Sequence, residues 1–232
     1  MRIAILEDQP DQAALLKSFL ENAGHDCHAF TAGEALIKAA GRESFDMFML
    51  DWEVPGLSGE EVLRWVRAHV ATPVPVMFVT GRDAEAEADI ISALSQGADD
   101  YMKKPVTRGE LQARVEALRR RAYPHQDAGV LEVGRFRFDR TNNAVLSSGA
   151  PVDLTQKEFE LAWFLFQNLG RLLSRDHIQE AVWGRRMLAS TSRSMDTHLS
   201  RLRIKLDLRP ETGIVLTPVY NYGYRLEQAG AP

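Results

Sequence analysis

Short apolar runs alternate with amphipathic stretches through the first half of this 232-residue chain. Each run has the length of a buried strand. The runs are residues 2–6, 25–30, 46–51, 74–79 and 99–102. Between them, apolar residues recur at helical spacing, as Leu16, Leu20 and Ala23 do. Strands that alternate with helices predict an α/β domain with a doubly wound, five-stranded parallel sheet and helices on both faces.

The second half changes to short strands that precede and follow a group of helices. The predicted strands are residues 131–133, 135–139, 143–147, 151–153, 214–218 and 222–226. Thr155 and Glu158 predict a capping box at the start of the first helix, Ser174 caps the second, and the third spans roughly residues 192–207. We therefore expect a first domain at 1–121, a linker at 122–129 and a smaller α+β domain at 130–232.

Polar residues directly follow four of the apolar runs in the first half. They are Glu7, Asp8, Asp51, Thr80 and Lys104. An open α/β sheet binds its ligands beyond the carboxyl ends of its strands, so we expect these side chains to share one pocket. Carboxylates that lie together repel one another unless a cation neutralises them. Oxygen-only ligands suit Mg²⁺, so the pocket is a candidate magnesium site.

The motifs around these residues cover the whole first half. They are Glu7-Asp8, the stretch from Asp51 to Gly59, Thr80-Gly81, and the stretch from Gly97 to Pro105. In this order they resemble the receiver domain of two-component response regulators, which has a flavodoxin-like fold. The resemblance implies that Asp51 accepts a phosphoryl group from a histidine kinase. It also implies that Asp8, Asp51 and the main-chain carbonyl of Glu53 ligate Mg²⁺, while Glu7 holds a metal-bound water.

The resemblance gives roles to three further residues of the pocket. Lys104 would supply a charge to one phosphoryl oxygen and Thr80 a hydroxyl to another, while Tyr101 would turn inward as Thr80 moves. By residue type alone, Lys103 could fill the same role as Lys104. We assign the role to Lys104 because the family pattern places the phosphoryl-binding lysine directly before proline. We also expect the Lys104–Pro105 peptide bond to be cis.

Charge is divided unevenly along the chain. Residues 1–122 hold 14 Lys and Arg against 20 Asp and Glu, and residues 123–232 hold 14 against 12. Residues 185–209 alone carry seven basic and two acidic side chains. An acidic first half and a basic patch in the second indicate two separate tasks, and the patch favours a polyanionic partner over a merely solvated helix face.

Composition adds three expectations about the setting of the protein. No apolar run approaches the roughly 18 residues needed to span a bilayer, and the chain begins with a strand pattern rather than a signal peptide. The single cysteine, Cys27, lies in an apolar stretch, where a buried position is expected. We therefore expect a cytoplasmic protein with no membrane partner.

The predicted third helix of the second half has an apolar back and a basic front. Its apolar stripe is Met195, Leu199, Leu202 and Leu206. Such a helix fits the major groove of double-stranded DNA, although a solvated amphipathic helix has the same pattern. The candidate contacts to DNA on this helix are Arg193, Thr197, His198, Ser200, Arg201, Arg203 and Lys205. We expect Arg193, Thr197 and Arg201 near base edges, and His198, Arg203 and Lys205 at phosphates.

Motifs in the second half resemble the winged-helix domain of the OmpR/PhoB subfamily. They are the stretches 154–161, 174–184, 193–203 and 223–226. The resemblance implies a transcription regulator that dimerises on phosphorylation, binds tandem DNA half-sites and has RNA polymerase as a partner. Its catalysis would be limited to self-phosphorylation and slow self-dephosphorylation. Two alternatives are a Mg²⁺-dependent phosphatase, in which Glu53 assists Asp51, and a DNA-binding protein with a degenerate receiver.

Two features depart from the pattern of the subfamily. A basic residue of the usual dimer interface aligns with Ile90, which predicts a more apolar interface. The expected interface residues are Ile90, Ile91, Leu94, Asp99, Asp100, Glu110 and Arg114. At the tip of the final hairpin, Tyr220 aligns with an arginine that enters the minor groove, and Asn221 replaces the usual glycine. Tyr220 either touches the DNA backbone or packs on the hairpin, so we expect a small contribution from the wing.

Overall fold

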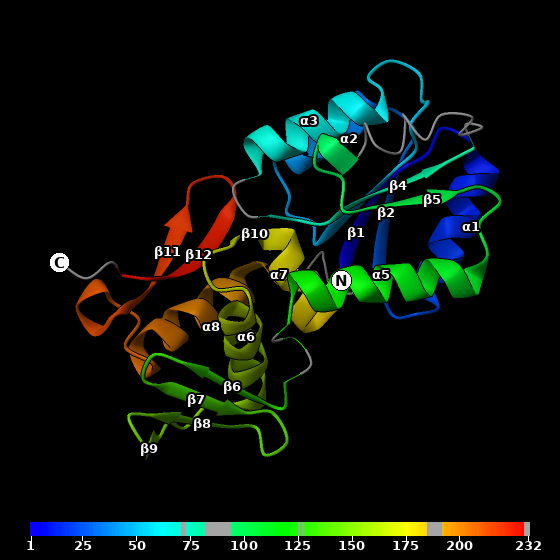
Figure 1. The fold of residues 1–232 in the computed structure, drawn as a ribbon. Helices are drawn as coiled ribbons and strands as arrows, with labels where there is room; N and C mark the ends of the chain where they lie inside the picture. Colours follow the sequence, from blue (N-terminus) through cyan, green and yellow to red (C-terminus); the bar gives the residue numbers. More distant parts are fainter. Residues whose placement is uncertain (71–72, 82–93, 125, 127, 185–191, 230–232) are drawn as a thin grey trace. The chain divides into compact units, whose positions relative to one another are not determined.

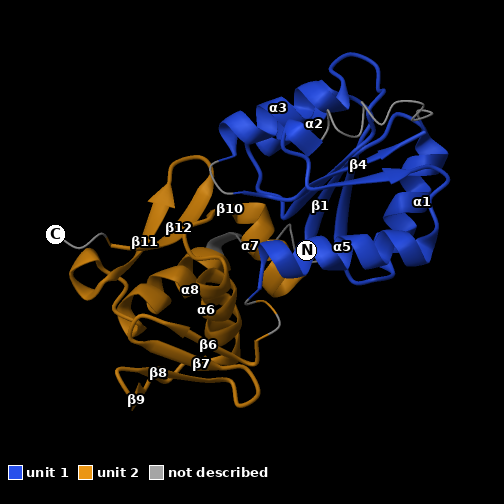
Figure 2. Ribbon diagram, viewed as in Figure 1, with its two compact units in different colours: residues 1–124 blue, residues 125–232 orange. Residues whose placement is uncertain are grey.

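The chain divides into two compact units, Met1–Pro124 and His125–Pro232 (Figure 2). The computed structural model describes all residues except 71–72, 82–93, 125, 127, 185–191 and 230–232 (Figure 1). Each unit has its own buried core. In the described residues, no helix is both long and apolar enough to cross a membrane.

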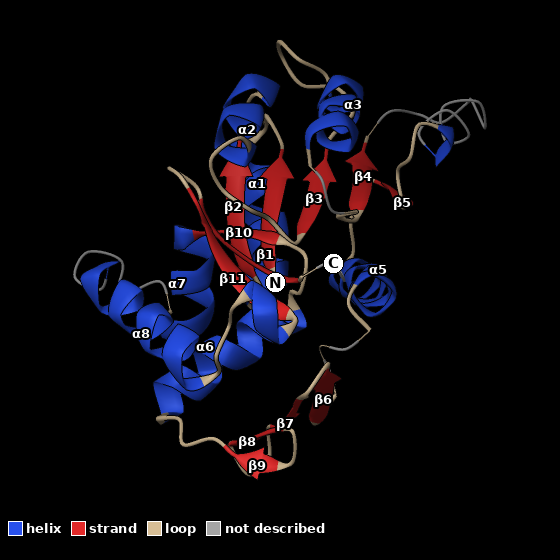
Figure 3. Cartoon of the chain, turned by 90° about the vertical axis from the view of Figure 1, so that its left-hand side faces the viewer, coloured by secondary structure: helices blue, strands red, loops and turns tan. Residues whose placement is uncertain are grey.

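Unit 1 is a five-stranded, fully parallel sheet, as the alternation of runs predicts (Figure 3). The strand order is β2-β1-β3-β4-β5. The strands are β1 (Arg2–Leu6), β2 (Asp26–Phe30), β3 (Met47–Leu50), β4 (Val76–Thr80) and β5 (Asp100–Lys103). The central strands β1, β3 and β4 are buried along their whole length, which explains their continuous apolar sequences.

Helices cover both faces of this sheet (Figure 1). They are α1 (Pro10–Glu21), α2 (Gly33–Ala40), α3 (Gly59–His69) and α5 (Arg108–Ala122). One core layer joins Leu36 of α2 and Val62 of α3 to the sheet, and the other joins Leu16 of α1 and Leu111 of α5. Cys27 lies buried in the second layer, as expected.

Unit 2 is a smaller α+β domain around a single core. A four-stranded antiparallel sheet precedes the helices and a three-stranded sheet, ordered β10-β12-β11, completes it. The strands are β6 (Val130–Val133), β7 (Phe136–Asp139), β8 (Ala144–Ser147), β9 (Ala150–Pro151), β10 (Leu172–Ser174), β11 (Ile214–Val219) and β12 (Gly223–Gln228). The helices are α6 (Gln156–Gln167), α7 (Arg175–Trp183), α8 (Ser192–Lys205) and the short 3-10 helix η2 (Pro210–Thr212).

Local signals in the sequence explain several helix starts of unit 2. The Thr155 side chain accepts a hydrogen bond from the backbone N–H of Glu158, and the Glu158 carboxylate accepts one from Thr155, so the predicted capping box is confirmed. Ser174 caps α7 by accepting from the backbone N–H of His177, also as predicted.

Most element boundaries differ from the expectation by one or two residues, and a few differences have a clear physical cause. β4 begins at Val76 rather than residue 74, because Pro75 has no N–H to donate to the sheet. The β9 strand is Ala150–Pro151 rather than 151–153. Helix α8 ends at Lys205, and Asp207 already has φ +50°, outside the helical region. Tyr123, expected in the linker, is buried and donates a hydrogen bond to the main-chain oxygen of Asp46 at 2.7 Å.

Candidate functional site

The ends of four neighbouring strands bring the predicted pocket residues of unit 1 together. Glu7 and Asp8 follow β1, Asp51 follows β3, Thr80 ends β4, and Lys104 follows β5. Carboxylate oxygens of Glu7, Asp8 and Asp51 all lie within 4.8 Å of one another. The parallel order of the strands therefore builds one acidic pocket from segments almost a hundred residues apart.

Lys104 is ion-paired with two of these carboxylates. Its Nζ lies 2.6 Å from Glu7 Oε2 and 2.6 Å from Asp51 Oδ2. Glu7 is 1% exposed and Asp51 6%, so both charges are removed from water and depend on Lys104 for compensation. The Lys104–Pro105 bond is cis, as expected.

The pKa values of this pocket reflect burial and charge together. Burial raises the pKa of Glu7, and the hydrogen bond from Lys104 opposes that rise without cancelling it. Burial alone would lower the pKa of Lys104, but its hydrogen bonds to Asp51 and Glu7 outweigh this effect and raise it. Lys104 is therefore held as a cation between the carboxylates.

Thr80, Tyr101 and Glu53 surround this centre. Thr80 is 2% exposed, and its main-chain oxygen accepts a hydrogen bond from the N–H of Lys104 at 2.9 Å. Tyr101 is half-buried on β5, opposite Phe78 of β4. Glu53 is exposed, and its backbone N–H donates to Asp51 Oδ1 at 3.4 Å.

Gly59 shapes the pocket in a way that the sequence motif alone did not reveal. A Cβ at this position would meet the main-chain oxygen of Asp51 at 2.1 Å, so only a residue without a side chain fits. The residue before it, Ser58, caps α3 through a capping box with Glu61. The start of α3 is thereby fixed against the backbone of Asp51. The Ser58-x-x-Glu61 spacing is the sequence signal for this helix start.

The outer side of α8 in unit 2 carries most of the predicted DNA contacts. Thr197, Ser200 and Arg201 are exposed, and His198 is half-buried. Opposite them, Met195, Leu199, Leu202 and Leu206 lie in the core, which confirms the predicted apolar stripe. The side chain of Arg193 lies outside the described residues.

Arg203 and Lys205 have partners inside unit 2. Arg203 donates two hydrogen bonds to the main-chain oxygen of Leu216 on β11, at 3.1 and 2.9 Å. Lys205 Nζ lies 2.8 Å from the buried Glu158 carboxylate and 2.9 Å from the main-chain oxygen of Asp153. Both cations therefore also fix the position of α8, and their contact with phosphates stays a prediction.

A polar triad links α8 to the helix before it and to the final strand. Asp196 of α8 accepts hydrogen bonds from Tyr224 Oη of β12 at 2.8 Å and from an Arg175 guanidinium nitrogen of α7 at 2.9 Å. The pKa of Tyr224 is raised by burial and by its hydrogen bond to Asp196. The triad holds the exposed side of α8 in one orientation relative to the hairpin.

The hairpin between β11 and β12 exposes Tyr220 at its tip. Tyr220 is 90% exposed, so it does not pack on the hairpin. Asn221 has φ +56°, the left-handed conformation that asparagine tolerates in a tight turn. The turn is therefore formed as predicted, with the tyrosine ring free to meet a partner.

The expected dimer residues of unit 1 lie partly within its described portion. Arg114 donates hydrogen bonds to Asp100 and Glu110 of the same chain, and Asp99 pairs with Arg67 at 2.8 Å. Leu94 is 45% exposed. Ile90 and Ile91 lie outside the described residues.

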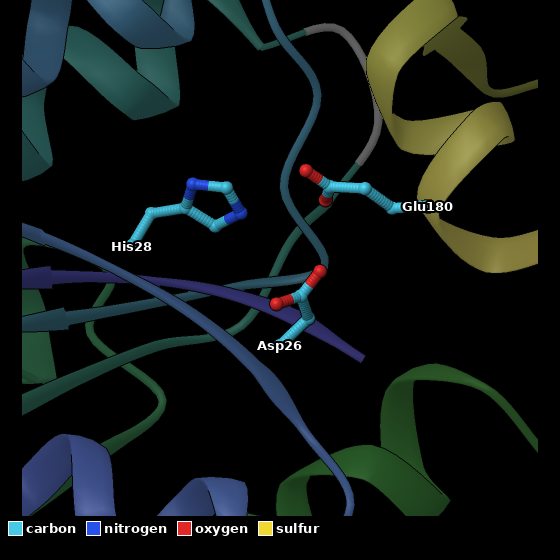
Figure 4. Close-up of side chains that lie close together, drawn as sticks. All are labelled: Asp26, His28 and Glu180. Atoms are coloured by element: carbon cyan, nitrogen blue, oxygen red, sulfur yellow. The ribbon is translucent and has the colours of Figure 1, made fainter. Parts of the chain in front are cut away.

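Asp26 and His28 project from β2 of unit 1, and Glu180 belongs to α7 of unit 2 (Figure 4). Inside unit 1, His28 Nε2 accepts a hydrogen bond from Arg2 Nε at 3.0 Å. His28 therefore has a structural partner in its own unit.

The sequence is similar to known proteins over its whole length. Residues 3–116 match the family described as response regulator receiver domain, and residues 149–226 the family described as transcriptional regulatory protein, C terminal. The sensory transduction protein RegX3 of Mycolicibacterium smegmatis is 36% identical over 229 residues, which cover 97% of this chain and 98% of that protein. The phosphate regulon transcriptional regulatory protein PhoB of Rhizobium meliloti is 36% identical over 228 residues, with the same coverage of 97% and 98%.

One solved structure that resembles the chain is the response regulator DrrB, an OmpR/PhoB homolog from Thermotoga maritima. It is 25% identical, covers 97% of this chain and 98% of its own, and has a TM-score of 0.46.

A receiver fold with an acidic pocket, followed by a transcriptional regulatory domain, defines a response regulator rather than a classical enzyme. The chain belongs to the OmpR/PhoB subfamily of two-component response regulators. A histidine kinase and DNA follow as its partners.

Proposed function

We propose that Asp51 accepts a phosphoryl group from a histidine kinase and that this modification controls binding of unit 2 to DNA. The observation that carries the proposal is the Lys104 ammonium, 2.6 Å from both Asp51 and Glu7 in a pocket of three carboxylates. In the transfer, an oxygen of Asp51 forms a bond to phosphorus as the bond from phosphorus to the donor breaks. Before the transfer, the Lys104 ammonium would neutralise the Asp51 carboxylate. During the transfer, it would stabilise the negative charge on the phosphoryl oxygens.

The donor set of the pocket fits Mg²⁺. Three carboxylates within 4.8 Å supply the hard oxygen ligands that this ion prefers. Asp8, Asp51 and the main-chain oxygen of Glu53 would hold it directly, and Glu7 through a water. When bound, Mg²⁺ supplies positive charge next to the transferred group.

Two further side chains would carry the signal away from the pocket. The Thr80 hydroxyl would donate a hydrogen bond to a phosphoryl oxygen, because Thr80 ends the strand beside Asp51. Tyr101 lies on the next strand and is half-buried, so a further inward turn of its ring would follow the movement of Thr80. This pair would change the surface formed by β5, α5 and the segment that precedes β5.

That surface is the proposed dimer interface. Asp99, Asp100, Glu110 and Arg114 contribute charge and Leu94 exposed apolar surface, and Ile90 and Ile91 would extend it. A dimer places two copies of unit 2 on tandem half-sites, which raises the effective concentration of the second copy. RNA polymerase would be the later partner, and the cytoplasm the location.

In unit 2, the proposed DNA contacts lie on α8 and the hairpin tip. Thr197 and Arg201 would contact base edges, together with Arg193, and Ser200 would lie beside them. His198, Arg203 and Lys205 would contact phosphates, and Tyr220 the sugar-phosphate backbone. The exposure of Thr197, Ser200, Arg201 and Tyr220 supports this assignment.

Phosphorylation with acetyl phosphate and Mg²⁺, followed by intact-mass analysis, tests the first step. The unchanged chain should gain one phosphoryl group, Asp51→Asn none, and Asp8→Asn far less because it binds Mg²⁺ more weakly. Asp11→Asn, an exposed carboxylate on α1, is the matched control and should behave like the unchanged chain. Labelling that persists in Asp51→Asn, or steady turnover of small phosphoesters, would contradict the proposal.

A further inference from the structure

Ile204 is an apolar side chain that the core of unit 2 does not use. It is 79% exposed, far more than Leu15, Val130 or Leu94, which lie between 39% and 45%. Among the described large hydrophobic residues, only Tyr220 at the hairpin tip is more exposed, at 90%. Within the described residues, the two most exposed large hydrophobic side chains thus lie on the two elements proposed to meet DNA.

Ile204 continues the exposed stripe of α8. Thr197, Ser200, Arg201 and Ile204 follow the spacing i, i+3, i+4 and i+7, so they lie on one side of the helix. All four are exposed. The core stripe that contains Leu199 and Leu202 lies on the other side. Ile204 therefore stands beside Ser200 and Arg201 on the surface that would face the bases.

The two cations that flank Ile204 are bonded to other groups of unit 2. Arg203 donates to the main-chain oxygen of Leu216, and Lys205 binds Glu158 and the main-chain oxygen of Asp153. These contacts fix the rotation of the last turn of α8. Because that rotation is fixed, the Ile204 side chain is held outward, and it neither hydrogen-bonds nor carries charge.

The chemistry of the major groove offers one good partner for such a side chain. Base edges there present hydrogen-bond donors and acceptors, and the apolar group among them is the C5-methyl of thymine. We propose that Ile204 packs against a thymine methyl in the half-site and so selects a T·A pair at that position. The inference rests on the proposed DNA binding by α8 and adds one base preference to it.

Removal of single methyl groups from the DNA tests this contact. The probe is the duplex that the full-length phosphorylated chain enriches from a random library, with each thymine of one half-site replaced in turn by deoxyuridine. The unchanged chain should lose about fourfold in affinity at one position, the effect of one buried methyl group. Ile204→Ala should bind the thymine duplex more weakly and should show no further loss at that position.

Two controls distinguish loss of the contact between Ile204 and thymine from a general loss of stability or DNA binding. Val130→Ala removes apolar surface from a β6 residue that is 41% exposed, and it should keep the full response to deoxyuridine. Ile204→Ala should keep the thermal unfolding midpoint of the unchanged chain, because the side chain is outside the core.

The outcomes distinguish this inference from the function on which it rests. If the chain enriches no sequence at all, DNA binding itself is wrong. If it enriches a sequence but Ile204→Ala responds to deoxyuridine as the unchanged chain does, the methyl contact is wrong. If Ile204→Ala binds a single half-site normally and loses only cooperative binding to two, Ile204 contacts a second copy of the chain, and the inference is overturned.

Discussion

At the scale of single residues, the acidic pocket depends on how closely α3 approaches Asp51. Gly59 allows this approach, because an added Cβ would lie 2.1 Å from the Asp51 main-chain oxygen and 3.0 Å from the Phe78 ring. The Asp51 main-chain oxygen cannot move aside as the end of a flexible side chain can. Any larger residue at position 59 must therefore move the start of α3.

Gly59→Ala should therefore lower the free energy of unfolding by about 1–3 kcal/mol, the usual effect of overpacking. It should also slow phosphorylation, because the backbone of Asp51 shifts. Gly109→Ala is the control, since nothing lies within 4 Å of a Cβ there and the substitution suits helix α5. Urea unfolding measures the free energy of unfolding of the two variants. Equal values for Gly59→Ala and Gly109→Ala would contradict the steric explanation.

The sequence predicted which residues lie together in the acidic pocket of unit 1, but it could not predict the partners of the cations on α8 in unit 2. Glu7, Asp8, Asp51, Thr80 and Lys104 each follow or end a buried run, and parallel strands must bring such positions together. The internal pairing of Arg203 and Lys205 was not visible, because it depends on where β11 and α6 lie in space. A helical wheel shows the direction of a side chain but not what meets it there.

At the scale of elements, α8 is held against α6 by the buried Glu158. Burial alone would raise the pKa of this carboxyl, but the hydrogen bonds from Lys205 and from Thr155 outweigh burial and lower it below 4.5. A carboxyl with a lowered pKa stabilises the folded state above its unfolded pKa and loses that contribution as pH falls through the folded value.

Lys205→Met should accordingly destabilise unit 2 by about 1–2 kcal/mol at pH 7, since it leaves Glu158 buried without its cation. The difference from the unchanged chain should shrink in acid, as pH falls through the lowered folded pKa of Glu158 and its carboxylate becomes protonated. Lys157→Met is the control, because its partner Glu160 is partly exposed and such pairs contribute less. Urea unfolding at several pH values tests this, and a pH-independent difference would count against it.

The hairpin tip is the second element with a testable role. Tyr220→Arg should tighten DNA binding and steepen its salt dependence by roughly 0.9 in the log–log slope, the value for one phosphate contact. Arg201→Ala should cost about 1–3 kcal/mol, concentrated at one base pair. Affinities at several salt concentrations measure both effects. A larger loss from Tyr220→Ala than from Arg201→Ala would make the hairpin the principal reader of sequence.

Most elements could be predicted because their signals are local. The capping box of Thr155 and Glu158 and the cap of Ser174 depend on residues three apart. Strand β10 was missed, because three residues show no usable periodicity and the strand forms by pairing with β12, fifty residues later. Such pairing is a property of the tertiary structure and leaves no local pattern.

At the scale of the whole molecule, the charges of the proposed dimer surface are already paired within one chain. Arg114 lies 3.0 Å from Asp100 and 2.9 Å from Glu110. In the described part of this surface, Asp100, Glu110 and Arg114 therefore already have partners within the chain, and Leu94 adds exposed apolar surface.

We expect dimerisation of the phosphorylated chain to depend weakly on salt, because the apolar part of the interface is not screened. Sedimentation at low and high ionic strength measures this. Arg114→Ala, which removes the internal pairs, should leave the salt dependence weak. Dissociation of the unchanged dimer by salt would show that charge pairs between chains hold it.

Phosphorylation of Asp51 is proposed to control DNA binding by unit 2. The most direct measurement is the affinity for the enriched duplex before and after treatment with acetyl phosphate and Mg²⁺, in the unchanged chain and in Asp51→Asn. The affinity of the unchanged chain should rise by about tenfold or more, through the effective concentration that a dimer provides, and Asp51→Asn should not respond. An equal rise in Asp51→Asn, or no rise in a chain shown by mass to be phosphorylated, would contradict this proposal.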